Sequence, residues 1–365
     1  MATSVPSPAK ARQLYVRTPL LCSRKLSERV GANVWLKMES VQTSGSFKTR
    51  GLSNFAKKAV ERGCTRFASS SGGNAGLAAA YIARQLGLPI TVVVPETTPS
   101  FIADKLREEG AEVEVVGKVR GFLSCDCHRN WCQGIQTPLN ANISIIRYGM
   151  KPIGELWSWP NNLHNLINHF PIHGCELIHP FDHPDIWEGH ASIVEEIQEQ
   201  LQGVTPDLVV LSVGGGGLMN GVLEGMARVG WTQVPLLAIE TQGAHSLNAC
   251  VAAGEWVELD DITSIATCLG AKRVCERSYQ WLSQHPVLTA TVTDREAVSA
   301  CINIADDHRV LVPPALWSSS GRTLYSISFG DGHSQTATPL KNVVAILCGG
   351  NGVNLETIQQ WKKNI

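Results

Sequence analysis

The stretch SGSFKTRG, residues 44–51, decides how this chain can be interpreted. Its small residues indicate a loop, and apolar residues then recur at helical spacing, so a helix is predicted over 48–62. Lys48 therefore stands where a loop enters a helix, close to backbone N–H groups and to the positive helix end. That position, together with partial burial, is expected to lower its pKa. A neutral amine attacks an aldehyde carbonyl, as Schiff-base chemistry requires. The competing interpretation is a solvated surface lysine.

Outward from this stretch, apolar strands alternate with helical patterns. The first block predicts strands at 33–38, 66–70, 90–94 and 112–116, with helices at 48–62, 74–86 and 100–109. The second block predicts strands at 208–213, 236–240 and 343–347, with helices at 186–201, 218–229 and 294–306. This alternation is typical of an α/β fold with parallel sheets flanked by helices. Two blocks predict two lobes, with ligands held in a cleft between them at the carboxyl ends of strands.

Two glycine-containing turns follow predicted strands. The turn SSSGGNAG at 69–76 offers hydroxyls and N–H groups that suit a carboxylate, although an N-cap turn without a ligand explains it equally well. The run Gly214 to Gly217 lets backbone amides approach a phosphate closely, yet it lacks both the G-x-G-x-x-G spacing and the Lys-Ser/Thr of a P-loop. Cys348, at the end of the last predicted strand, is either a core residue or a ligand contact.

Composition restricts the class of protein. The 365 residues are 44% hydrophobic and 17% charged, which suits about two packed lobes. The formal charge of -1 has no basic block, so no nucleic-acid partner is expected. No apolar run reaches membrane-spanning length and the start shows no signal-peptide pattern, so we expect no membrane partner. The eleven scattered cysteines fit reduced thiols in a cytoplasmic protein.

Taken together and in this order, the four motifs resemble the β-family, or fold type II, of pyridoxal-phosphate (PLP) enzymes. Within it the chain is similar to serine dehydratase/threonine deaminase, most of all to the mammalian-type serine dehydratase and serine dehydratase-like branch. PFDHPDIWEGHAS at 180–192 and ETQGAHS at 240–246 also resemble that branch. The resemblance implies a two-lobed, tryptophan-synthase-β-like fold. A large PLP-binding domain would span 1–38 and 183–365, and a small domain would span 39–182.

The resemblance also implies roles for individual residues. Lys48 would carry PLP as a Schiff base, Phe47 would pack on its ring, and Asn74 would bind its phenolic oxygen. Cys348 would face the pyridine nitrogen. The implied phosphate-binding residues are Gly214, Gly215, Gly216 and Gly217, and the implied substrate-binding residues are Ser71, Gly72 and Gly73. Glu240, Ala244, Leu269 and Ala271 match a monovalent-cation (K⁺) site, and a homodimer is implied as well.

Two segments depart from the family pattern. Residues 118–175 lose periodicity, and their Cys125-x-Cys127-His128-x3-Cys132 cluster raises the question of zinc, although its spacing matches no standard ligand pattern. At 313–323, PPALWSSSGRT stands where the family has a helix of small residues. Both segments resemble locally altered coding sequence.

The resemblance implies an L-serine/L-threonine ammonia-lyase that produces pyruvate or 2-oxobutanoate and ammonia. Lys48 would remove the Cα proton, and a neutral Cys348 at the ring nitrogen would favour prompt elimination. The alternatives are a serine racemase or another β-family PLP enzyme, and a catalytically impaired PLP-binding homologue.

Overall fold

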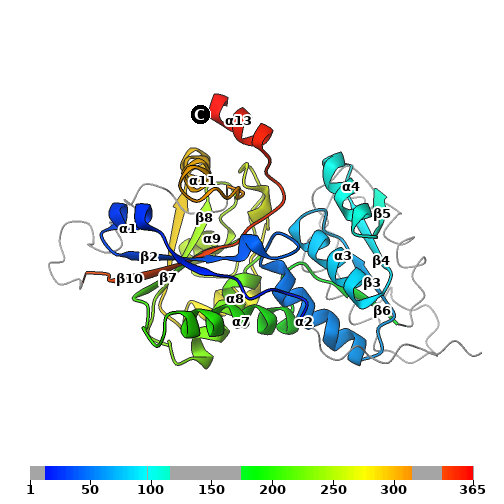
Figure 1. The fold of residues 1–365 in the computed structure, drawn as a ribbon, viewed down its shortest axis with the longest axis horizontal. Helices are drawn as coiled ribbons and strands as arrows, with labels where there is room; N and C mark the ends of the chain where they lie inside the picture. Colours follow the sequence, from blue (N-terminus) through cyan, green and yellow to red (C-terminus); the bar gives the residue numbers. More distant parts are fainter. Residues whose placement is uncertain (1–12, 97, 116–173, 315–338, 365) are drawn as a thin grey trace, which may run out of the picture.

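The computed structural model describes residues 13–96, 98–115, 174–314 and 339–364 as two α/β units built on separate sheets (Figure 1). The larger sheet has the strand order β1-β2-β10-β7-β8-β9. Its strands are β1 Leu20–Cys22, β2 Asn33–Met38, β7 Leu208–Ser212, β8 Leu236–Thr241, β9 Val287–Val292 and β10 Asn342–Leu347. Only β1 runs antiparallel to its neighbour, so the other strands end at one edge of the sheet.

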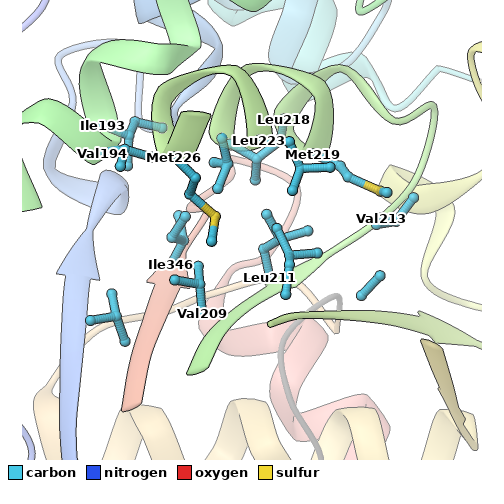
Figure 2. Packing of buried hydrophobic residues seen from close by; sticks show 14 of the residues in the cluster. Ile193, Val194, Val209, Leu211, Val213, Leu218, Met219, Leu223, Met226 and Ile346 are labelled. Atoms are coloured by element: carbon cyan, nitrogen blue, oxygen red, sulfur yellow. The ribbon is translucent and has the colours of Figure 1, made fainter. Parts of the chain in front are cut away.

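Helices cover both faces of the larger sheet. Two of them, α7 (Pro184–Gln200) and α8 (Gly217–Arg228), pack on one face, whereas α1 (Arg24–Val30) and α11 (Asp294–His308) pack on the other. Figure 2 shows Met226 of α8 against Val209 and Ile346 of the central strands. Because β7 and β10 are almost entirely apolar and covered on both faces, they read as continuous hydrophobic runs in the sequence.

The smaller sheet is entirely parallel and has the order β5-β4-β3-β6. Its strands are β3 Arg66–Ser69, β4 Ile90–Val94, β5 Glu112–Val115 and β6 Cys175–Ile178. The helices that contribute to its hydrophobic core are α2 Lys48–Glu61, α3 Asn74–Leu86 and α4 Ser100–Glu108. Ile186 of α7 joins the same core.

Helix α2 connects the two units. It packs against α7 along one side and against α3 along another, and Figure 1 shows it between the two sheets. Gly51 and Gly189 allow the close approach of α2 to α7, since a Cβ on Gly189 would lie 2.7 Å from the Arg50 carbonyl oxygen. The helix that begins at Lys48 is therefore fixed by both halves of the molecule.

Every helix and strand predicted above is present, with ends shifted by a few residues at most. The largest shifts are two residues, at the start of α7 and at the end of α11. Helix α7 begins early because the His183 side chain accepts the Asp185 N–H and caps the helix. The sequence patterns missed β1, α1, β6 and β9, and also α9 (Ser246–Ala253), α10 (Glu276–Trp281), α13 (Leu355–Asn364) and the 3₁₀ turns at Glu39–Val41 and Thr267–Leu269. These elements are short, or their burial pattern lacks a clear period.

The Cys125/Cys127/His128/Cys132 cluster, most of the atypical segment 118–175 and residues 315–323 of PPALWSSSGRT lie outside the described residues. Within the described ranges, no His, Cys, Asp and Glu side chains gather in a group able to hold a metal ion. No helix in these ranges combines the length and apolarity needed to cross a membrane.

Candidate active site

Lys48 is the first residue of α2, and its amine lies between two aromatic rings and one carbonyl. Its Nζ donates to the Pro180 carbonyl oxygen at 2.5 Å. The ring centroid of Phe47 is 5.1 Å away and that of Phe181 is 5.9 Å away. No carboxylate among the described residues forms an ion pair with Lys48.

This environment lowers the pKa of Lys48 to about 8, because surrounding protein removes the water that would stabilise the ammonium. The nearby thiols of Cys275, Cys348 and Cys268 offset the effect slightly. The side chain keeps part of its surface accessible, although protein encloses its amine. Roughly a tenth of the amine is therefore neutral at pH 7. The prediction of a lysine whose pKa is lowered by its helix-start position and by partial burial agrees with this geometry, and burial is the main cause.

The loop before Lys48 is held by the residues that follow β10. The Phe47 N–H donates to the Cys348 carbonyl at 3.1 Å, and Ser46 pairs with Gly349 in an isolated β-bridge. Asn351 Nδ2 donates to the Ser44 carbonyl at 2.7 Å. Strand β10 of the larger sheet therefore fixes the backbone on which Lys48 is carried.

Asn74, the first residue of α3, reaches the residues that follow β10 from the side of the smaller sheet. Its Oδ1 accepts the Asn351 N–H at 2.9 Å. A Cβ on Gly350 would lie 2.7 Å from Asn74 Nδ2 and 2.6 Å from the Pro313 ring, so only glycine fits at this crossing. The motifs that contain Lys48, Asn74 and Cys348 converge in the structure, although they are far apart in the sequence.

The predicted substrate-binding turn, Ser71 to Gly73, leads directly into Asn74. Ser71 Oγ accepts the Gly73 N–H at 3.3 Å, which leaves the turn compact. A Cβ on Gly76 would lie 1.8 Å from the Ser71 carbonyl oxygen, so the turn packs directly on the first turn of α3. The N–H groups at this helix start are suited to a carboxylate.

The glycine run links β7 to α8 and is shaped for close backbone approach. Gly216 has φ +89°, and the Gly215 carbonyl accepts the Cys275 N–H at 3.0 Å and its thiol at 2.8 Å. Because a trans peptide directs its C=O and N–H oppositely, the Gly216 N–H faces away from Cys275. A Cβ on Gly217 would meet the Phe181 carbonyl oxygen at 2.5 Å. Unpaired N–H groups at the start of α8 and the absence of side chains fit a phosphate group.

Cys348 is buried at the end of β10, where its Sγ lies 3.5 Å from Ser212 Oγ. Burial raises the pKa of its thiol, so the side chain is neutral at physiological pH. It also lies near the Lys48 amine. A buried, neutral thiol is what the sequence interpretation expects of Cys348 as the uncharged partner of a ring nitrogen.

Part of the predicted cation site lies beside the glycine run. The Leu269 backbone packs against Gly214, Leu269 and Ala244 share a small apolar cluster, and the Leu269 carbonyl accepts the Ala271 N–H at 2.7 Å. Glu240 is buried, and burial raises the pKa of its carboxyl to about 7. Its two oxygens accept the N–H groups of Leu247 and Asn248 at the start of α9, at 2.9 and 2.8 Å.

Sequence reasoning did not single out Pro180, Phe181, Asn351 or Cys275, all of which contact predicted site residues. The signal for the first two was present in Pro-Phe-Asp-His-Pro, where two prolines flank an aromatic residue just before a helix. Asn351 is the last residue of the motif Leu347-Cys348-Gly349-Gly350-Asn351 at the end of the last predicted strand, but no role was predicted for it.

The site thus combines a lysine amine of lowered pKa, a glycine run at a helix N-terminus and a neutral thiol at a strand end. The chain matches the family of pyridoxal-phosphate dependent enzymes over residues 11–349, and it belongs to that family. It is 42% identical to a mouse serine dehydratase-like protein over 94% of this chain and 93% of that protein. It is 40% identical to human L-serine dehydratase/L-threonine deaminase over 96% of each chain.

Solved structures agree with this assignment. A fungal L-serine ammonia-lyase from Rhizomucor miehei superposes with a TM-score of 0.76 at 30% identity, over 96% of this chain and 99% of that one. Serine racemase from Dictyostelium discoideum gives a TM-score of 0.71 at 24% identity, over 93% and 94% of the two chains, and shares the fold.

Proposed function

We propose that this chain is a PLP-dependent L-serine/L-threonine ammonia-lyase that produces pyruvate or 2-oxobutanoate and ammonia. The observation that carries the proposal is the Lys48 amine, which contacts the Phe47 and Phe181 rings and has no carboxylate partner among the described residues. The relatives at about 40% identity, which are named serine dehydratase-like and L-serine dehydratase/L-threonine deaminase, support the substrate class.

The same residues provide a binding site for the cofactor. Lys48 would attach it covalently, the N–H groups of Gly214 to Gly217 would bind its phosphate, and Phe47 would pack on its ring. Asn74 and Cys348 would contact the phenolic oxygen and the pyridine nitrogen. Bound PLP would supply the electron sink for the pair that remains when the substrate Cα loses its proton.

The chain itself would orient the substrate and move the proton. The N–H groups at Ser71, Gly72 and Gly73 would hold the substrate carboxylate at the start of α3. Lys48, once released, would accept the Cα proton on Nζ, since its lowered pKa leaves part of the amine neutral near pH 7. Because burial keeps the Cys348 thiol neutral, Cys348 would give the ring nitrogen no acidic partner, and this would favour loss of the β-hydroxyl over slower competing reactions.

Finer features belong to the same proposal. Residues 1–38 and 183–365 would form the PLP-binding domain and 39–182 the small domain. Glu240, Ala244, Leu269 and Ala271 would surround a monovalent cation, whose charge would stabilise the ionised form of the buried Glu240. The protein would act as a cytoplasmic homodimer in amino-acid catabolism.

The test uses the purified chain loaded with PLP. Borohydride reduction followed by peptide mapping should place the cofactor on Lys48. Incubation with L-serine and L-threonine should release ammonia and the matching 2-oxo acid. D-serine as the main product would favour a racemase instead, and bound PLP without turnover of any of these amino acids would identify an impaired homologue. A chain that binds no PLP would overturn the proposal.

A further inference from the structure

The loop from His179 to His183 connects β6 of the smaller sheet to α7 of the larger one, and it supplies the acceptor for the Lys48 amine. That acceptor is a main-chain carbonyl, Pro180 O, at 2.5 Å. A carbonyl is a neutral acceptor and carries no proton. It therefore orients the amine but favours the ammonium much less strongly than a carboxylate would.

Two side chains and one packed ring hold this carbonyl in place. The imidazole of His179 accepts two backbone N–H groups through Nδ1, from Phe181 at 3.2 Å and from Asp182 at 2.6 Å. On the other side, Trp187 Nε1 donates to the Phe181 carbonyl at 2.8 Å. The peptide groups after Pro180 are therefore fixed from both sides.

The Phe181 ring adds the third contact. It packs so closely on the glycine run that a Cβ on Gly215 would lie 2.5 Å from ring atoms. The His179 ring stands edge-on to it, with centroids 4.7 Å apart. Because His179 is buried, its position is set by packing rather than by solvent. The loop thus forms one rigid unit with the predicted phosphate-binding segment.

We propose that His179 and Trp187 are positioning residues that hold the Pro180 carbonyl as the docking point of Lys48 while this lysine acts as the base. With one N–H donated to Pro180 O, the lone pair of the neutral amine is directed away from the loop. When the substrate C–H bond breaks, its electron pair stays on the substrate, and the proton forms a new N–H bond on Lys48 Nζ. The resulting ammonium keeps its hydrogen bond to the same carbonyl, so the lysine accepts the proton without reorienting.

This inference rests on the proposed function, and it gives His179 a role that a conservative variant can test. Asparagine accepts N–H groups two and three residues ahead through Oδ1, as in an Asx turn or a helix cap, so His179→Asn keeps both bonds of the loop. His179→Ala removes both. Trp187→Phe keeps the ring in its packing position and removes only the bond to the Phe181 carbonyl.

The first measurement follows the rate at which PLP-free protein forms a borohydride-reducible bond with PLP across pH 6–10. A carbonyl acceptor favours the ammonium, so its loss should lower the pH midpoint by about 0.5–1 pH unit in His179→Ala. Trp187→Phe should shift the midpoint in the same direction by less, and His179→Asn should match the wild type. A change limited to folding would alter the melting temperature without moving this midpoint.

The second measurement compares turnover of L-serine with that of L-serine deuterated at Cα. In His179→Ala, kcat should fall about ten-fold and the isotope effect should rise, because a misplaced base makes proton removal slower. If His179→Ala does not fold, Trp187→Phe decides the question. Midpoints and isotope effects equal to the wild type in the folded variants would overturn the inference alone. A wild-type chain that captures no PLP would overturn the proposed function and this inference with it.

Discussion

Lys48 and Arg50 are two cations on the first turn of α2, and their surroundings are opposite. Lys48 has a carbonyl and two aromatic rings around its amine and no acidic partner among the described residues. Arg50, fully buried, donates to both oxygens of Glu39 at 2.8 Å and to both oxygens of Glu196 at 2.7 and 2.8 Å. The ring of Tyr15 covers its guanidinium at 4.8 Å.

The two pKa values move in opposite directions for this reason. Burial lowers the pKa of Lys48 to about 8, since no carboxylate among the described residues compensates for the lost water. Burial would also lower the pKa of Arg50, but the hydrogen bonds to Glu196 and the charge of Glu39 outweigh it and raise the pKa above its usual value. Lys48 can therefore lose its proton near neutral pH, whereas Arg50, two residues further along the chain, stays charged.

Arg50 holds helix α2 in place, and Lys48 is suited to a chemical role. The carboxylates that hold Arg50 come from the 3₁₀ turn after β2 and from α7, and Lys37 of β2 adds a bond to Glu196 at 2.6 Å. The network therefore ties the start of α2, and with it the backbone of Lys48, to the larger sheet. Each prediction below changes one side of this arrangement.

Replacing Lys48 should have the largest effect, and that effect should fall on chemistry. We expect Lys48→Ala to abolish reducible PLP attachment and to reduce 2-oxo acid formation by at least about 10³-fold, because it removes both the attachment point and the base. Its fold should persist, since within the described ranges the lost amine makes one hydrogen bond and no ion pair. Reduction, peptide mapping and a coupled pyruvate assay measure the outcome. Reducible PLP retained in the variant would contradict the assignment of Lys48.

Replacing Arg50 by alanine should damage the fold instead. Arg50→Ala leaves Glu39 and Glu196 buried without their main cation, which typically costs about 3–5 kcal/mol of unfolding free energy. Urea unfolding of PLP-free protein measures the loss. The surface pair Arg107–Asp104 provides a control, because Arg107→Ala should change stability by less than about 1 kcal/mol. Similar unfolding curves for both variants would show that the buried network does not anchor α2.

Arg50→Lys sharpens the same comparison. Lysine keeps the charge but cannot form paired hydrogen bonds to two carboxylates at once, so we expect a loss of about 1–3 kcal/mol. The retained charge should make this variant clearly more stable than Arg50→Ala. Equal stability of the two variants in urea would mean that geometry alone, and not charge, accounts for the contribution of Arg50.

The two sides of this comparison were not equally readable from the sequence. SGSFKTRG, the glycine run and the terminal Cys-Gly-Gly predicted the place of Lys48, because each sits at a strand-to-helix junction or strand end that local patterns mark. The partners of Arg50 could not be predicted, since Glu196 lies 146 residues away and approaches only through α7 packing on α2. The contact between Lys48 and the Pro180 carbonyl could not be predicted either, because every residue type supplies the same main-chain acceptor. Edge strand β1 was missed because it has only three residues, and β9 because threonines interrupt its apolar run.

The smallest expected effect is the dependence of stability on pH through Lys48. Its folded-state pKa, about 8, lies below the ordinary value of 10.5, so the folded chain binds this proton less tightly than the unfolded chain. Below pH 8 both states carry the proton, and folding bears the full cost of the buried ammonium. Between about pH 8 and 10.5 the folded state loses the proton first, so stability rises with pH.

The comparison that isolates this effect is between wild type and Lys48→Met, both free of PLP. From pH 7 to pH 9.5 the unfolding free energy of the wild type should rise relative to the variant by about 1–2 kcal/mol, and the variant should be the more stable of the two at pH 7. Other titrating groups cancel because both proteins contain them. Arg50 contributes nothing to the difference, since its pKa is raised and it stays charged throughout this range. A constant difference between the two proteins would mean that the Lys48 amine is as well solvated in the fold as in the unfolded chain, and its assignment as the reactive member of the pair would lose its physical basis.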